Sequence, residues 1–162
     1  MTPPPGEIAG FPHRAWRART AVRRGLRRVF SPVKSAFVLW ALADRNDPRE
    51  AHIAREVHAA HEAAWEGAMT WFEQEAAYTR AGAGGVAQMK TNGLLLAAFE
   101  HRDSRTGDPD LHTRVAVETK VQGVDGKWRS LGGRMLHNLG VAASERYNSL
   151  SGPKAAGEPR RR

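Results

Sequence analysis

Two histidines carry the clearest chemical signal in the sequence. His101 stands at the end of one expected strand and His112 at the start of the next, joined by the polar stretch 102–110. An antiparallel hairpin would bring the two imidazoles together, and neutral imidazole is a common ligand of divalent metals, although a third ligand is wanted for a complete site. The residue that shares a strand face with His112 is Arg114, whose guanidinium has no lone pair to donate. We therefore expect an incomplete metal site.

Other motifs that could carry chemistry do not hold. His61 and Glu62 resemble the start of the zincin helix motif, but Trp65 stands where the second histidine ligand is needed. We expect His58 and His61 to be ordinary surface residues of a helix. The stretch 82–85 lacks the Gly-Lys-Ser/Thr of a P-loop, no Gly-x-Ser-x-Gly elbow occurs, and the chain has no cysteine for a thiol nucleophile, disulfide or zinc ribbon.

Two helices are expected in the first half of the chain. Ser31 and Pro32 form the N-cap and first-turn pair typical of a helix start, so we expect a helix over 31–43. Its apolar residues predict a largely buried element. Asp47, followed by proline, predicts the start of a long second helix over 47–77, which carries apolar residues at helical spacing.

The strands are expected mainly in the second half. The pattern predicts strands over 26–30, 94–101, 111–121 and 128–131, with an Asp-Gly hairpin turn before the last of them. A final helix is expected over 133–150. Helices clustered early and hairpins later favour an α+β domain with an antiparallel sheet and packed helices.

The net positive charge of the chain is concentrated near its two ends. The 162 residues fit one domain and carry a net charge of +8, but seven arginines lie between positions 14 and 28. Between 29 and 150 there are 14 Lys plus Arg against 15 Asp plus Glu, so the body is near neutral. We expect residues 1–28 to be a disordered Arg/Pro-rich arm and 151–162 a disordered basic tail. No apolar run is long enough for a membrane span, and no secretory signal is present; with no cysteine, these features favour a cytoplasmic protein.

The stretch from Phe99 to Lys120 resembles the three-histidine metal motif of MobF-type (TrwC-like) conjugative relaxases, which belong to the HUH endonuclease superfamily. That motif has a histidine on one strand, a loop similar to Ser-Arg-x-x-Asp-Pro, and Leu-His-x-His on the next strand. The matching residues are His101, Ser104, Arg105, Asp108, Pro109, Leu111 and His112. Three further segments fit in the same order, namely 30–35 (Phe-Ser-x-x-Lys-Ser), 75–85 and 125–133. The resemblance covers residues 29–150 and implies a partial relaxase domain with the HUH palm-like fold.

The resemblance also implies a reaction. In that family a tyrosine attacks a phosphodiester of single-stranded DNA at the transfer origin, and a metal held by three histidines polarises the scissile phosphate. The divalent metal of the family is Mg²⁺, Mn²⁺, Zn²⁺ or Ni²⁺. The resemblance therefore implies single-stranded DNA and other relaxosome proteins as partners, and no membrane.

The sequence departs from the family at the positions that do the chemistry. The family's nucleophilic tyrosines precede the Phe-Ser-x-x-Lys-Ser segment, whereas the tyrosines here, Tyr78 and Tyr147, match no catalytic position. The acidic residue expected three before Phe30 is Arg27, and the closing histidine is Arg114. We expect a truncated, degenerate relaxase domain that lacks transesterase activity and has weak or lost metal binding.

These departures leave two other interpretations open. The chain could be a non-catalytic single-stranded DNA-binding accessory protein of a relaxosome, in which Arg114 replaces the metal and contacts phosphate. It could also be an enzyme whose tyrosine comes from another chain. We expect no catalytic residue in the chain itself, and we expect DNA contacts from Lys34, Arg102, Arg105 and Arg114.

Overall fold

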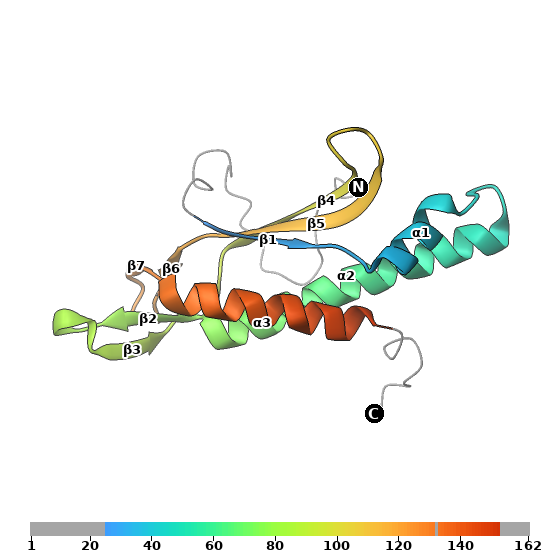
Figure 1. Cartoon of the computed structure of the whole chain (residues 1–162). Coiled ribbons are helices and arrows are strands. Elements are labelled where there is room, and N and C mark those ends of the chain that lie inside the picture. Colours follow the sequence, from blue (N-terminus) through green and yellow to red (C-terminus); the bar gives the residue numbers. More distant parts are fainter. Residues whose placement is uncertain (1–24, 132, 153–162) are drawn as a thin grey trace, which may run out of the picture.

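The computed structural model describes residues 25–131 and 133–152. Residues 1–24 and 153–162, which include most of the two expected arms, lie outside the described residues. In chain order the main elements are β1 (Leu26–Phe30), α1 (Lys34–Leu42), α2 (Pro48–Ala76), β2 (Tyr78–Ala81), β3 (Ala87–Lys90), β4 (Leu96–Asp103), β5 (Pro109–Val117), β6 (Lys120–Gln122), β7 (Trp128–Ser130) and α3 (Gly133–Ser151). The α+β class with antiparallel strands is confirmed (Figure 1).

A three-stranded antiparallel sheet in the order β1-β5-β4 forms the centre of the fold. Val29 of β1 and Phe99 of β4 both lie opposite Arg114 of β5. Because successive strand residues point to opposite faces, Val29, Phe99 and Arg114 share one face with the pair His101 and His112. We call this side of the sheet the histidine face.

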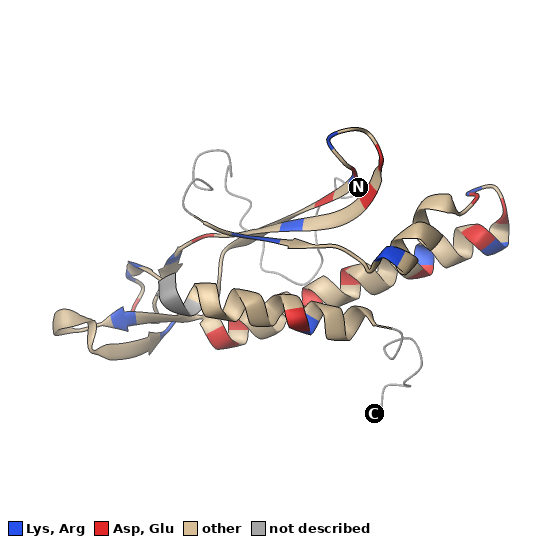
Figure 2. Cartoon of the chain, in the orientation of Figure 1, with Lys and Arg blue, Asp and Glu red and all other residues tan. Residues whose placement is uncertain are grey.

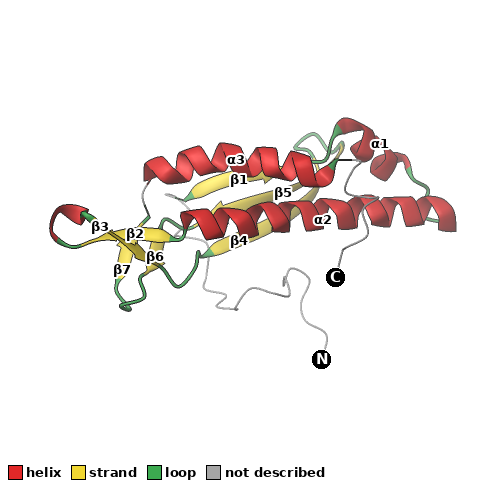
Figure 3. Ribbon diagram, turned by 90° about the horizontal axis from the view of Figure 1, so that it is seen from below, coloured by secondary structure: helices red, strands yellow, loops and turns green. Residues whose placement is uncertain are grey.

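The long helices α2 and α3 run side by side across the other side of the sheet (Figure 3). We call this side the helix face. The core lies between these two layers, and its largest buried members are Phe30, Trp65, Met69, Phe72 and Tyr147. The alternating pattern of β5 follows directly, because Val115 and Val117 face the helices while Arg114 faces away.

The start of α2 confirms the capping signal in the sequence. The Asp47 side chain accepts a hydrogen bond from the backbone N–H of Arg49 at 2.8 Å, and Pro48 occupies the first helical position. The helix ends at Ala76, one residue before the predicted end, and buries a stripe that includes Ala64, Ala68 and Phe72.

The prediction for α1 was wrong in two respects. The helix begins at Lys34 with Val33 as N-cap and no side-chain cap, so Ser31 does not start it. None of its residues is buried, and Val38 and Leu39 are 46% and 55% exposed. The helix packs against one end of α2 and touches β5 but lies outside the core between the layers, so its apolar residues stay partly exposed (Figure 1).

The smaller strands differ from the prediction. Tyr78–Ala81 and Ala87–Lys90 pair as an antiparallel hairpin that the sequence pattern did not indicate. Its connection contains Gly84 and Gly85 with φ near 68° and 69°, a conformation that favours glycine. The strand predicted over 111–121 is divided, because β5 ends at Val117 and β6 pairs separately with β7.

Among the described helices, none has the length and apolar character needed to cross a membrane.

Candidate functional site

The two histidines meet as the sequence predicts. His101 and His112 lie directly opposite each other in the antiparallel pairing of β4 and β5. Their rings are stacked, with centroids 5.0 Å apart and planes 8° from parallel. His112 is buried, at 3% exposure, whereas His101 is half-buried. The hairpin therefore brings two imidazoles together on the histidine face.

The hydrogen bonds around His112 determine which of its nitrogens carries a proton. Nδ1 lies 2.8 Å from the backbone oxygen of Asp110 and 3.2 Å from that residue's carboxylate. Both are acceptors, so Nδ1 is the N–H donor. Nε2 then holds the lone pair, and it accepts a hydrogen bond from Nε of Arg114 at 3.2 Å. The lone pair that would bind a metal is therefore engaged by a guanidinium.

This arrangement does not fit the three-histidine metal centre. A metal ion on Nε2 of His112 would have to displace the Arg114 N–H and would stand beside its positive charge. At about 4 Å the repulsion between two unit charges is about 1 kcal/mol in water and about 4 kcal/mol at an effective dielectric constant of 20, and a divalent ion doubles these values. Arg114 also lies on the same face as His112, as the strand alternation predicts.

The four predicted DNA-binding cations do not converge. Arg114 lies on the histidine face, but Arg102 folds back along β4 and donates from Nε to Glu100 at 2.7 Å. Arg105 is exposed in the loop between β4 and β5, and Lys34 is the first residue of α1. Of the four predicted cations, the structure groups Arg114 with the histidines, whereas Arg102 bonds to Glu100 of the helix face and the other two lie in the loop and in α1.

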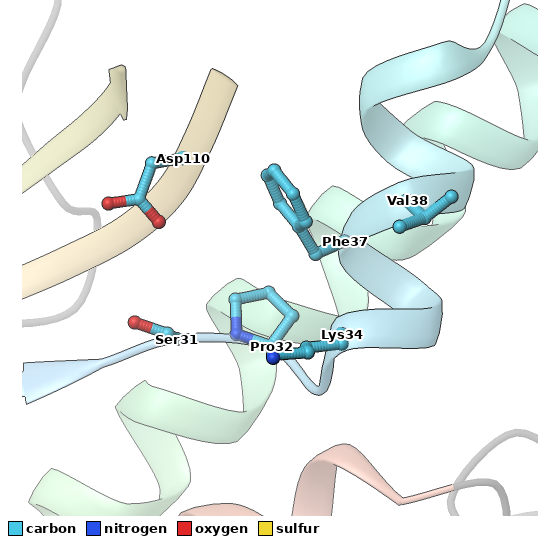
Figure 4. A pocket seen from close by; sticks show the side chains of 6 residues that line it. All are labelled: Ser31, Pro32, Lys34, Phe37, Val38 and Asp110. Carbon is cyan, nitrogen blue, oxygen red and sulfur yellow. The ribbon is translucent and has the colours of Figure 1, made fainter. Parts of the chain in front are cut away.

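A pocket of about 360 Å³ adjoins the histidine pair. Figure 4 shows its wall, formed by Ser31, Pro32, Lys34, Phe37, Val38 and Asp110. Asp110 links this pocket to the site, because the same residue contacts Nδ1 of His112. Ser31, Pro32 and Lys34 belong to the segment identified by its resemblance to a family motif, and they thus line a pocket that shares Asp110 with the histidine face.

Behind the sheet, His61 corrects a prediction. It is 1% exposed and is not a surface residue. Its Nδ1 lies 2.8 Å from the hydroxyl of Tyr147, and its Nε2 lies 2.9 Å from Oγ1 of Thr113. Burial, followed by the nearby His58, lowers the pKa of His61 to about 4. The available signal was its place on the apolar stripe of α2, three residues before Ala64.

Neither tyrosine lies on the histidine face. Tyr147 is buried in α3 on the helix face, where burial raises the pKa of its hydroxyl above the ordinary value. Tyr78 begins β2 in the smaller hairpin. No hydroxyl nucleophile of a tyrosine in this chain is therefore next to His101 and His112.

Figure 2 shows how the charges are distributed. Acidic positions are spread along α2, while β1 and the middle of β5 are basic. The basic positions on these strands are Arg27, Arg28 and Arg114. Phe99, 48% exposed, and Val29, 56% exposed, lie opposite Arg114. Sequence reasoning missed these two apolar residues, although the strand register identifies them once it is known.

Comparison with known proteins identifies the domain. The family model described as TrwC relaxase matches residues 8–150. The match begins well before residue 29, where we expected the resemblance to start, so it includes part of the stretch assigned to an arm. No curated protein matches the chain.

Solved relaxase structures show the same fold. One is the metal-bound structure of the conjugative relaxase TrwC in complex with OriT DNA, with a TM-score of 0.67 and 26% identity over 93% of this chain and 51% of that chain. Another is TrwC complexed with a 27-mer DNA comprising the recognition hairpin and the cleavage site, with a TM-score of 0.66 and 25% identity over 94% and 54%. The chain spans about half the length of these structures. It belongs to the TrwC relaxase family.

Proposed function

We propose that the chain is a relaxase-type domain that binds single-stranded DNA of a transfer origin without cleaving it. The observation that carries this proposal is the hydrogen bond from Nε of Arg114 to Nε2 of His112. It places a permanent cation where a metal-binding lone pair is needed. We further propose that the domain acts in the cytoplasm alongside other relaxosome proteins.

The histidine face carries the kinds of side chain that bind single-stranded DNA. Phosphates are attracted by cations, and the planar guanidinium of Arg114 can offer two parallel N–H donors. Bases stack on aromatic rings, and Phe99 is half-exposed opposite Arg114. Lys34, in the adjoining pocket, adds a second cation. The solved TrwC relatives are bound to OriT DNA, which supports the same class of ligand.

The lack of cleavage follows from the same residues. Arg114 preserves a positive charge toward a phosphate, but it cannot polarise the phosphate through a coordination bond as a metal does. Tyr147, with its hydroxyl buried against His61, cannot reach a phosphodiester on the other side of the sheet. The domain therefore retains binding groups while lacking the groups for strand transfer.

DNA binding is tested by fluorescence anisotropy with a labelled single-stranded oligonucleotide from the transfer origin. Phe99→Ala should weaken binding by about 1–3 kcal/mol, or about fivefold to hundredfold, because a stacked base loses its ring. Arg114→Ala should also weaken binding. Lys127→Ala, in the turn between β6 and β7, removes an exposed cation and should have little effect. Equal affinity of all three variants and the native protein would contradict the proposal.

Cleavage is tested separately with the same oligonucleotide. In magnesium or manganese, no protein–DNA adduct should form, because the chain brings no tyrosine to the histidine face. A covalent adduct that survives a denaturing gel would show that the domain is an active transesterase.

A further inference from the structure

A second group of possible metal ligands lies on the helix face. His58 and Glu62 are one turn apart on α2, and Glu100 approaches them from β4. One ligand atom from each of the three residues lies within 4.8 Å of those of the other two. Two elements far apart in the sequence thus bring one imidazole and two carboxylates close together.

This cluster is separate from the histidine face. Glu100 lies opposite Thr113 in the pairing of β4 and β5, and the Thr113 side chain bonds to His61 of α2. The next residue of β4, His101, points to the opposite face and stacks on His112. The two groups therefore stand back to back across the sheet.

We propose that His58, Glu62 and Glu100 bind a divalent transition-metal ion, Zn²⁺ or Ni²⁺, that joins α2 to β4. Imidazole nitrogen and carboxylate oxygen both bind such ions, and three protein ligands with water in the remaining position form a usual coordination shell. The site does not depend on the proposed DNA-binding function. Its expected contribution is to hold the β4–β5 hairpin against the long helix.

The three side chains are close enough to share one ion after they rotate. Nε2 of His58 lies 2.7 Å from Oε2 of Glu100, and Nδ1 of His58 lies 3.7 Å from Oε2 of Glu62. Ligand atoms at roughly 2.0–2.2 Å from one tetrahedral ion lie roughly 3–3.5 Å apart. Each carboxylate faces a different nitrogen of the His58 ring, so one carboxylate must turn toward the nitrogen that the other faces before all three residues share one ion.

The surroundings also favour a bound cation. The side chains of His58 and Glu100 are only 24% and 28% exposed, which limits competition from water. Arg102 holds Oε1 of Glu100 and leaves Oε2 toward His58.

The same helix provides a matched control. His52 and Glu56 have the spacing of His58 and Glu62, with Nδ1 and Oε1 4.0 Å apart, but both are well exposed. The metal-ligand group found among the described residues does not include them. If helical spacing alone were enough for binding, both pairs would bind an ion.

The experiment is calorimetric titration of the full chain with zinc chloride and with nickel chloride. We expect one ion for each chain, and at least a tenfold loss of affinity in His58→Ala, Glu62→Gln and Glu100→Gln. His52→Ala should bind as the native protein does. Circular dichroism confirms that each variant is folded, and the ion should raise the Tm of the native protein but not of Glu62→Gln, whose carboxylate is half-exposed.

Three results would overturn the proposal. The first is that the native protein binds neither ion. The second is that His58→Ala and Glu62→Gln bind the ion as the native protein does. The third is that binding is lost in His101→Ala. The last result would place the ion on the histidine face instead. None of these outcomes depends on DNA, so the DNA-binding proposal and the metal proposal can fail independently.

Discussion

Arg114 and His112 act as one unit on the histidine face. Among the described residues, His112 is the group to which Arg114 is hydrogen bonded, through Nε alone. In the proposed function, the terminal nitrogens of the guanidinium contact a phosphate. Asp110 fixes the orientation of the His112 imidazole, and the imidazole in turn orients the Arg114 guanidinium. The arginine side chain should therefore lose less conformational entropy when it binds an anion.

Arg114→His is expected to change metal binding. The comparison is made in a His58→Ala background, so that only the histidine face is measured. The substitution supplies a third imidazole and removes the competing cation, and should raise nickel or zinc affinity by orders of magnitude. Calorimetric titration of both proteins measures the effect. It should not create cleavage, since no tyrosine moves. Equal affinities would mean that position 114 cannot reach an ion shared with His101 and His112.

His61 predicts an acid-sensitive fold. Its pKa is about 4 in the folded chain and 6.5 as the ordinary value, so the unfolded chain binds the proton more readily. Its contribution to stability is complete above pH 6.5 and is lost as the pH falls toward 4, by about 3 kcal/mol in all. Urea unfolding at pH 7 and pH 5 measures this dependence.

The variant His61→Gln isolates that effect. Glutamine keeps hydrogen-bonding groups toward Tyr147 and Thr113 but does not titrate, so stability should depend less on pH than in the native protein. His52→Gln, at an exposed position, should keep the native dependence. The assignment to His61 would be wrong if both variants showed the same pH profile.

At the scale of elements, β1 and α3 meet through Arg28 and Gly140. The Arg28 guanidinium lies where a Cβ at position 140 would be, and Nη2 donates to the backbone oxygen of His137 at 3.5 Å. Glycine inside a helix costs about 1 kcal/mol relative to alanine, so its presence here is explained by the close approach of the arginine. Nε of Arg28 is buried and has no hydrogen-bond partner among the described residues.

This contact predicts a reversal between two backgrounds. Gly140→Ala should destabilise the native protein by about 1–3 kcal/mol, because the arginine must be displaced. In Arg28→Ala, the same change should be neutral or stabilising, since only helix propensity remains. Urea unfolding of the four proteins gives the coupling energy. Additive effects would show that the two residues do not compete for one space.

The elements differ in how well the sequence predicted them. Asp47 and Pro48 identified the start of α2 because a cap is a local interaction. Ser31 and Pro32 suggested the same for α1, but the chain remains extended there and the helix begins at Lys34. The hairpin of β2 and β3 was missed because its strands are short and its turn depends on glycines with positive φ.

The candidate site was predictable in position but not in detail. The loop between His101 and His112 was enough to predict that they pair. The proton on Nδ1 of His112 was not predictable, because it depends on the orientation of the Asp110 carbonyl. Glu100 and His58 converge only through the packing of β4 on α2, which no local pattern encodes.

At the scale of the whole molecule, most of the net positive charge lies on residues outside the part that the structure describes. Five of the seven arginines between 14 and 28 precede residue 25. These residues should give any DNA binding a steep salt dependence through counterion release. Removing residues 1–24 should therefore weaken binding to single strands and flatten the dependence on salt.

The measurement is anisotropy across a salt series with both proteins. A reduced slope with a remaining preference for single strands over duplex would assign charge to the removed residues and recognition to the histidine face. An unchanged slope would place the main phosphate contacts on the body, around Arg114 and Lys34.

The pleat of β4 has a thermodynamic consequence. Glu100 and His101 are consecutive, yet one belongs to the proposed ion site and the other to the histidine face. A shift of β4 moves both residues. Binding of an ion at the proposed site and binding of DNA at the histidine face should therefore be coupled. Thermodynamic linkage makes such coupling reciprocal. If bound zinc raises the affinity for DNA by some factor, bound DNA must raise the affinity for zinc by the same factor.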